Sequence, residues 1–364
     1  MRWDGQAVVA GDGGALPGLA LSGLLRSGRT PDLAGGTFHQ VAAKSAPNKG
    51  PEASTMPFRW TVNPMRGCLH ACAYCYARPT HEYLDLDAGR DFETQIVVKT
   101  NVVEVLRAEL ARPSWRREHV ALGTNTDPYQ RPEGRYGLMP GIIDALASSG
   151  TPFSITTKGP LLRRDLPALV AAAQQVPLGI AVSLAVLDPA LQQSVEPGTP
   201  LPRARLDLIR AVRDAGLPCG VFVAPVMPWL TDSEEHLGEL LAALADAGAT
   251  GATVLPMRLR GSVKPWFLRW LAQERPDLVA RYRRLYGRGA YVPVEYQNWL
   301  WARVRPLLAA HGFGTGAERL VGDARLAMGE RPEGGSYPAG SMPELAPGAG
   351  GGAATFEVDQ PVLF

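Results

Sequence analysis

The chain has 364 residues, of which 46% are hydrophobic and 20% charged, and its formal net charge is +2. This length allows one large domain or two ordinary ones, with a sizeable buried core. No stretch comes near the roughly 20 apolar residues that a membrane span needs, and the apolar segment 15–25 follows acidic rather than basic residues, so neither a membrane anchor nor a signal peptide is expected. The near-neutral charge excludes general attraction to nucleic acid and leaves only local basic patches.

The cysteines indicate the kind of site and the compartment. Four cysteines in a chain of this length do not form a disulfide framework. Three of them, Cys68, Cys72 and Cys75, fall within eight residues, which is typical of metal or cluster ligation under reducing conditions. The sequence therefore predicts a cytoplasmic protein.

Composition divides the chain into four parts. Residues 1–55 mix small residues, proline and isolated charges, which predicts a mostly disordered or wrapping arm, ordered mainly around 38–49. Residues 56–260 are the predicted catalytic core, and 261–313 a basic and aromatic helical extension. Residues 314–364 are rich in Gly, Pro and Ala and predict a flexible tail that ends in a short apolar motif.

Within the core, short apolar runs alternate with amphipathic stretches. The runs, which predict strands, are 58–62, 119–122, 153–156, 178–184, 220–223 and 251–255. The stretches, which predict helices, are 102–111, 141–148, 166–174, 205–215 and 234–247. Apolar strands joined by helices of about 10–15 residues indicate a parallel sheet with crossover helices. Six units predict an α/β fold, a partial (β/α)6 barrel of TIM type, with its chemistry at the C-terminal ends of the strands.

The cysteine loop, which follows the first predicted strand, has the pattern Cys-x3-Cys-x2-Cys, with Tyr74 just before Cys75. Three thiolates on one short loop can hold three irons of a 4Fe–4S cube and leave the fourth iron open. An open iron can chelate S-adenosylmethionine (SAM), and a reduced cluster can then cleave its sulfonium C–S bond and release a 5′-deoxyadenosyl radical. Two alternatives stay open at this point: a zinc site completed by His70 or His81, and a structural cluster with Cys219 or a histidine as fourth ligand.

The spacing, the aromatic at Tyr74 and the position after the first strand resemble the radical SAM superfamily. Further segments between residues 38 and 300 resemble its spore photoproduct lyase-like branch: Asn63-Pro64, Tyr74 to Arg78, Thr124 to Gln130, and Glu196-Pro197 followed by Arg205. The resemblance implies a lyase-like radical SAM enzyme with a 4Fe–4S cluster, SAM as cofactor, and a reduced flavodoxin or ferredoxin-type electron donor. The founding activity of that branch is radical repair of a thymine dimer in DNA. The true spore photoproduct lyases carry a hydrogen-donating cysteine in the segment that corresponds to 123–126, where this sequence has none, so their usual route of dimer reversal is not expected here.

Other polar residues at predicted strand ends extend the candidate site. Those expected to bind the cofactor are Tyr74, Thr124, Thr126, Asp127, Lys158, Ser183 and Arg205, and the expected metal ligands are Cys68, Cys72 and Cys75. Alternatives are an ordinary turn at 123–129, a solvated Lys158 and a core hydroxyl at Ser183. Arg205 would lie in the first turn of a helix, where its charge opposes the helix dipole, which predicts a specific partner: Glu196 or the SAM carboxylate. Tyr76 is a candidate for radical relay, with simple packing as the alternative, and no other catalytic residue is assigned.

Two segments suggest partners. Arg258 to Arg288 holds nine basic and two acidic residues interleaved with aromatics, which suits DNA or RNA contact; the alternative is a pair of helices whose aromatics pack inward. The terminal segment Gln360–Phe364 resembles the peptide by which bacterial repair and replication proteins dock on the sliding clamp, with docking on the chain's own barrel as the alternative.

Three hypotheses of function follow from these observations. The first is a radical SAM enzyme that acts on a nucleic acid in a repair-like reaction. The second is a radical SAM enzyme that modifies a small molecule or peptide. The third is a non-catalytic iron–sulfur or zinc protein.

Overall fold

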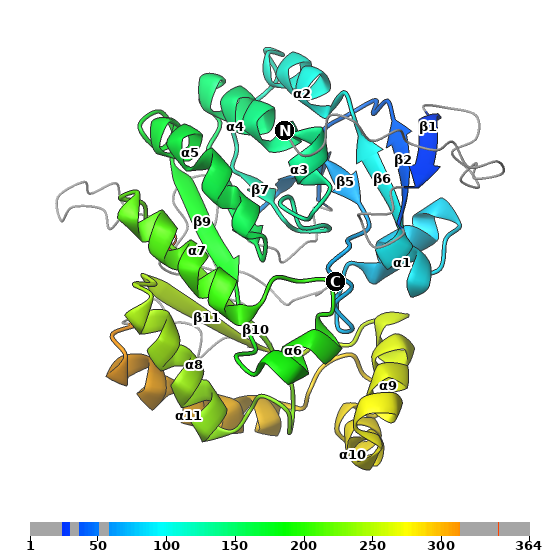
Figure 1. Ribbon diagram of the computed structural model, residues 1–364, viewed down its shortest axis with the longest axis vertical. Coiled ribbons are helices and arrows are strands. Elements are labelled where there is room, and N and C mark those ends of the chain that lie inside the picture. Colours follow the sequence, from blue (N-terminus) through cyan, green and yellow to red (C-terminus); the bar gives the residue numbers. More distant parts are fainter. Residues whose placement is uncertain (1–23, 30–35, 51–57, 314–340, 342–364) are drawn as a thin grey trace.

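The structure is a computed structural model that describes residues 24–29, 36–50, 58–313 and 341. Its larger sheet has seven strands in the order β11-β10-β9-β8-β7-β4-β3 (Figure 1). The strands are β3 (Pro47–Lys49), β4 (Trp60–Val62), β7 (Val120–Leu122), β8 (Phe153–Thr157), β9 (Leu178–Ser183), β10 (Gly220–Val226) and β11 (Gly251–Pro256). All pairings from β4 to β11 are parallel, and β3 runs antiparallel to β4. The prediction of six parallel strands in a partial (β/α)6 barrel is confirmed.

Helices link these strands and cover the outside of the sheet (Figure 1). They are α2 (Val102–Leu110), α3 (Glu133–Tyr136), α4 (Leu138–Ser148), α5 (Leu166–Ala173), α6 (Pro189–Val195), α7 (Pro202–Asp214) and α8 (Glu234–Asp246), with the 3-10 segment η2 (Pro160–Asp165). The amphipathic pattern decides which face is buried: α8 turns Leu237, Leu240, Leu241 and Leu244 inward. Its start is fixed by Ser233, whose side chain accepts a hydrogen bond from the backbone N–H of His236.

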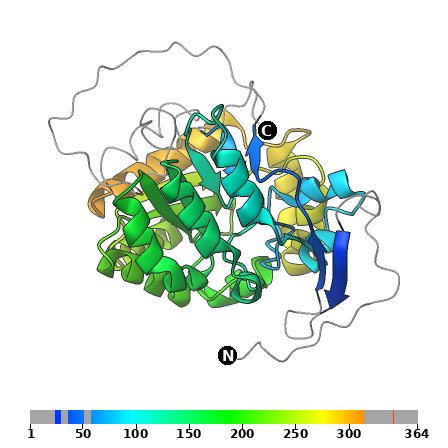
Figure 2. The same ribbon diagram turned by 90° about the horizontal axis from the view of Figure 1, so that it is seen from above.

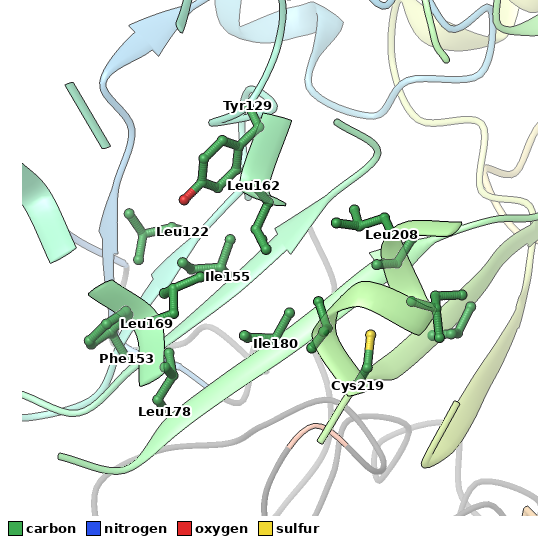
Figure 3. Packing of buried hydrophobic residues seen from close by; sticks show 14 of the residues in the cluster. Leu122, Tyr129, Phe153, Ile155, Leu162, Leu169, Leu178, Ile180, Leu208 and Cys219 are labelled. Carbon is green, nitrogen blue, oxygen red and sulfur yellow. The ribbon is translucent and has the colours of Figure 1, made fainter. Parts of the chain in front are cut away.

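The core lies between the sheet and these helices (Figure 3). Every residue of β9 is buried, because the barrel interior covers one face of the strand and helices cover the other. Cys219, at the start of β10, lies in this core with Ile180 and Leu208 and is completely buried. No helix among the described residues is both long and apolar enough to cross a bilayer.

A second sheet of four strands lies beside the barrel and was missed in the sequence (Figure 2). Its order is β1-β2-β6-β5, and its strands are β1 (Leu24–Arg29), β2 (Thr37–Val41), β5 (Met65–Arg66) and β6 (Gln95–Lys99). Strand β2 of the N-terminal arm runs parallel to β6, which pairs on its other side with β5. The apolar part of β6 is only three residues long, too short to separate a strand from a helix turn by pattern.

The remaining elements lie near the cysteine loop or in the C-terminal extension. They are η1 (Arg78–Leu84), α1 (Arg90–Thr94), α9 (Val263–Glu274), α10 (Pro276–Tyr286) and α11 (Val294–Ala310). The predicted clamp-binding segment Gln360–Phe364, and the tail apart from Ser341, lie outside the described residues.

Candidate iron–sulfur and S-adenosylmethionine site

The cysteine loop follows β4 and lies between β5 and η1, at the C-terminal ends of the parallel strands. This is the end of a barrel at which active sites form. Cys68 and Cys72 are buried, Cys75 is half-buried, and all three thiols are free. The loop therefore presents three unpaired sulfurs within one short stretch of chain.

Side chains from the loop after β7 hold the start of the cysteine loop. Gly67 has a φ of 78°, a conformation that favours glycine, and its carbonyl accepts hydrogen bonds from Thr126 Oγ1 (2.6 Å) and Gln130 Nε2 (3.1 Å). The backbone N–H of Leu69 donates to Gln130 Oε1 at 2.9 Å. Thr126, predicted to contact the cofactor, thus stabilises the loop in this structure. Gln130 stabilises it as well, through hydrogen bonds to the residues directly before and after Cys68.

The loop between α6 and α7 packs against the middle of the cysteine loop. A Cβ atom on Gly198 would lie 1.8 Å from the carbonyl oxygen of Leu69, so any other residue would push the two loops apart. The N–H of Gly198 donates to the His70 carbonyl at 3.1 Å, and that of Ala73 donates to the Val195 carbonyl at 2.9 Å. This close contact brings Glu196 next to the cysteines.

Asp127 connects the ends of β7 and β8. Its carboxylate accepts hydrogen bonds from Thr157 Oγ1 (2.6 Å) and from the backbone N–H groups of Tyr129 (2.9 Å) and Lys158 (2.6 Å). His70 Nδ1 of the cysteine loop lies 3.4 Å from Asp127 Oδ2. The predicted cofactor residue Asp127 therefore fixes three segments around the site in the described structure.

Glu196 is the centre of a buried charge network. Its carboxylate accepts hydrogen bonds from the Tyr74 hydroxyl and the Arg205 guanidinium, and Lys158 Nζ lies 3.9 Å away. Burial alone would raise the pKa of Glu196, but the charges of Arg205 and Lys158 and the two hydrogen bonds lower it to about 2. Glu196, which the sequence suggested only as a partner of Arg205, is therefore a carboxylate at neutral pH.

Four of the predicted cofactor residues meet around this carboxylate. Lys158 Nζ donates to Ser183 Oγ at 2.9 Å and lies 5.8 Å from the centre of the Tyr74 ring. Burial is the largest single effect and lowers the pKa of Lys158, but the negative charges around the amine, Glu196 foremost, together outweigh it, so the pKa is raised and the amine stays protonated. The network therefore holds the cationic Lys158 amine beside the cysteine loop, where it can meet a carboxylate.

Arg205 is paired with Glu196, the first of the two partners expected for it. It is fully buried, and besides Glu196 it donates to Thr199 Oγ1 (2.7 Å) and to the carbonyls of Ser183 (3.2 Å) and Pro200 (3.1 Å). These bonds explain a cation in the first turn of α7, since the carboxylate outweighs the unfavourable helix dipole. In the described structure Arg205 positions Glu196, and its contact with SAM stays a prediction.

Tyr76 and Thr124 lie together at the mouth of the site. The Tyr76 hydroxyl donates to the Thr124 carbonyl, although the side chain is 61% exposed. Thr124 Oγ1 lies 3.4 Å from the side chain of Asn63, at the end of β4. The exposed ring of Tyr76 is thus held beside Cys75, where an incoming molecule can touch it.

Two of the alternative fourth ligands, Cys219 and His81, lie away from the cysteine loop or are bonded elsewhere. Cys219 lies at the N-terminal end of β10, the opposite end of the barrel, and is buried in the core (Figure 3). His81 Nε2 is hydrogen-bonded to the Gln95 carbonyl at 2.9 Å, on the side of the second sheet. Within the described part of the chain, no three His, Cys, Asp or Glu side chains are gathered closely enough to share one metal ion. The donor set fits a cluster held by three thiolates better than a zinc ion, whose ligands would have to converge at about 2.3 Å.

A sequence model of the Radical SAM superfamily matches residues 62–241, the segment that runs from the end of β4 to α8. The chain belongs to the radical SAM superfamily. An uncharacterized protein of Mycobacterium tuberculosis is 62% identical over 334 residues, which covers 91% of this chain and 96% of that protein. An uncharacterized protein of Methanocaldococcus jannaschii is 24% identical over 181 residues, covering 50% of this chain and 65% of that protein.

The radical SAM fold of this chain is similar to that of spore photoproduct lyase. A structure of that enzyme complexed with dinucleoside spore photoproduct superimposes with a TM-score of 0.58, at 18% identity, over 75% of this chain and 79% of the lyase. At this identity the similarity concerns the fold. The expected resemblance to the lyase-like branch therefore holds for the architecture.

The C-terminal extension covers one side of the radical SAM site. Phe267, Tyr282 and Tyr286 of α9 and α10 are buried in a cluster that also contains Cys72 and Tyr74. For these three residues the structure shows the second of the two expected arrangements, a pair of helices whose aromatics pack inward, and DNA or RNA contact by the arginines of this segment stays a prediction. Trp229, which the sequence did not single out, is 39% exposed at the end of β10 and packs edge-on against Tyr282.

Proposed function

We propose that the protein is an enzyme that cleaves SAM reductively at the cysteine loop. The observation that supports it best is the set of three free thiols at the C-terminal ends of the strands, with no fourth cysteine at that end among the described residues. Membership of the radical SAM superfamily supports the same activity. A cluster held by Cys68, Cys72 and Cys75, with SAM on its open iron, would supply a 5′-deoxyadenosyl radical that abstracts a hydrogen atom from the substrate.

The chain's own residues would bind and orient SAM and shield the site from water. Lys158 would neutralise the SAM carboxylate, and Ser183, to which it donates a hydrogen bond, would bind the ribose. Glu196 keeps Lys158 protonated and holds it between Ser183 and the Tyr74 ring. The buried cluster of Cys72, Tyr74 and α9–α10 keeps water from that side of the site, which protects a reactive radical from side reactions.

The first test is made anaerobically on purified, iron-reconstituted full chain. After reduction with dithionite and addition of SAM, we expect about four irons per chain and the release of 5′-deoxyadenosine, detected by mass spectrometry. Zinc in place of iron, or a fully loaded cluster that yields no 5′-deoxyadenosine with or without nucleic acid, contradicts the proposal.

For the substrate, we propose a nucleic acid in a repair-like, lyase-type reaction. Helix α10 carries exposed arginines, among them Arg281, Arg283 and Arg284, while its buried face packs on the cluster that contains Cys72. Phosphates bound by these arginines would therefore lie on the same side of the molecule as the cysteine loop. Tyr76 and Trp229 supply exposed rings for bases. A small molecule or peptide is the alternative substrate.

Charge reversal on α10 tests this substrate class. Arg281→Glu with Arg284→Glu is expected to weaken single-stranded DNA binding at least tenfold at low salt, and to reduce the slope of log affinity against log salt by about 2. Fluorescence anisotropy over a salt series measures both quantities. Arg112→Glu with Arg116→Glu changes the same number of exposed charges beyond the end of α2, near the opposite end of the barrel, and should leave the slope unchanged. Equal slopes for the two double variants would exclude α10 as the binding surface.

Two further partners are proposed from the sequence and the family. The terminal segment Gln360–Phe364 would dock on the sliding clamp. A reduced flavodoxin or ferredoxin would supply the electron for SAM cleavage.

A further inference from the structure

We infer that Arg78 is a positioning residue for the cysteine loop, which it holds in the conformation that receives the iron–sulfur cluster. The inference rests on the proposed function, since it assumes that the loop binds a cluster. Arg78 follows Cys75 by three residues, at the start of η1, and its side chain folds back onto the loop.

All five N–H groups of the guanidinium are used. Nε and one N–H of Nη2 donate to the Cys72 carbonyl at 3.0 and 2.9 Å, and Nη2 also approaches the Ala71 carbonyl at 3.2 Å. Nη1 donates to the carbonyls of Gly89 (2.7 Å) and Ala88 (3.3 Å). A forked group therefore ties the cysteine loop to the turn before α1, which a lysine or glutamine could do only in part.

The loop conformation that Arg78 stabilises is not an easy one for this sequence. Ala71 has a φ of 53°, a left-handed conformation that is unfavourable for any residue other than glycine. Its carbonyl is one of those that face Arg78. The hydrogen bonds to Arg78 offset this cost, so the loop can keep its shape before any metal is bound.

The guanidinium is itself held in place and shielded. Arg78 is completely buried, and its charge is balanced by Glu93 of α1, at 2.8 Å. The Trp266 ring of α9 lies over it, with its centre 4.6 Å from Cζ, and a Cβ on Gly89 would lie 2.3 Å from the same ring. A buried charge with this many fixed partners does not move when the cluster is inserted.

The test compares Arg78→Lys and Arg78→Gln with the wild-type full chain after anaerobic reconstitution. We expect Arg78→Gln to retain less than a third of the wild-type iron, with a broadened EPR signal of the reduced cluster. Arg78→Lys should load more iron than Arg78→Gln but lose it to a chelator at least five times faster than wild type. Partial rescue by lysine is expected because it keeps the charge and some of the hydrogen bonds.

Controls separate positioning from general stability. Arg164→Gln removes an arginine that is partly buried and bonded to Glu133 and Asp165, and should lower the unfolding midpoint while iron content, EPR signal and chelation rate stay at wild-type values. If Arg78→Gln does not fold, as judged by circular dichroism, the chelation rate of Arg78→Lys decides. A wild-type rate and EPR signal in the folded Arg78 variants would overturn the inference, whereas failure of the wild-type chain to load iron would instead overturn the proposed function.

Discussion

The Cys72→Ala variant is expected to lose cluster binding and 5′-deoxyadenosine formation completely. Cys72 is the middle cysteine of the loop and lies in the buried cluster that joins the loop to α9 and α10. Two thiolates cannot hold three corners of a cube, so the remaining cysteines would bind iron weakly and in another form. Iron analysis and the visible absorption spectrum after anaerobic reconstitution measure the first loss, and mass spectrometry of the SAM products measures the second.

Cys219→Ala is the matched control for that experiment. Cys219 is as buried as Cys72 but lies at the other end of the barrel, in the core. Its replacement removes one sulfur and should leave iron content and product formation at wild-type levels. If the two variants behaved alike, the assignment of the cluster to the loop would be wrong.

The Glu196→Gln variant is expected to lose about 3–5 kcal/mol of unfolding free energy at pH 7, the cost of breaking a buried ion pair on one side. The change leaves the buried Arg205 and the nearby Lys158 without their opposite charge. Urea unfolding followed by circular dichroism measures the difference. Asp144→Asn, which breaks an exposed ion pair with Arg107, should cost less than about 1 kcal/mol.

The pH dependence of stability gives a second measure of the same carboxylate. The pKa of Glu196 is lowered from its usual 4.5 to about 2, so its contribution is fully present above pH 4.5 and is lost as the pH falls through 2. A shift of this size corresponds to about 3 kcal/mol. Between pH 5 and pH 2 the wild-type chain should therefore lose more unfolding free energy than Glu196→Gln. Parallel curves for the two proteins would contradict the lowered pKa.

The barrel was predictable because its strands are continuous apolar runs with an amphipathic helix after each. The strand from Leu178 to Ser183 can be predicted from its own residues, because both of its faces are buried and every position in it is therefore small or apolar. The cysteine motif could be predicted for a similar reason, because all three cysteines lie in one short segment of the sequence. Strand β6 was missed because its partner β2 comes from the N-terminal arm, and no pattern within Gln95–Lys99 shows that pairing.

The chemistry around the cysteine loop was only partly predictable. The position of Arg205 in the first turn of a helix led to Glu196 as a partner, because an unfavourable charge needs a compensating one. Nothing in the sequence shows that Thr126 faces the Gly67 carbonyl or that Arg78 folds back onto the Cys72 carbonyl. Such contacts depend on which loops meet after folding, and they decide whether a polar residue touches the cofactor or supports a neighbour.

The N-terminal arm has a consequence for any shortened form of the protein. Strand β3 pairs with β4 and forms the edge strand of the large sheet. Strand β2 pairs with the edge of β6 that would otherwise be unpaired. A chain that began after residue 55 would expose the unpaired backbone of both β4 and β6, which come before and after the cysteine loop in the sequence. Unpaired strand edges can pair with the edges of other chains and so cause aggregation. By covering both edges, the arm protects the radical site against aggregation and also supports the two strands around it.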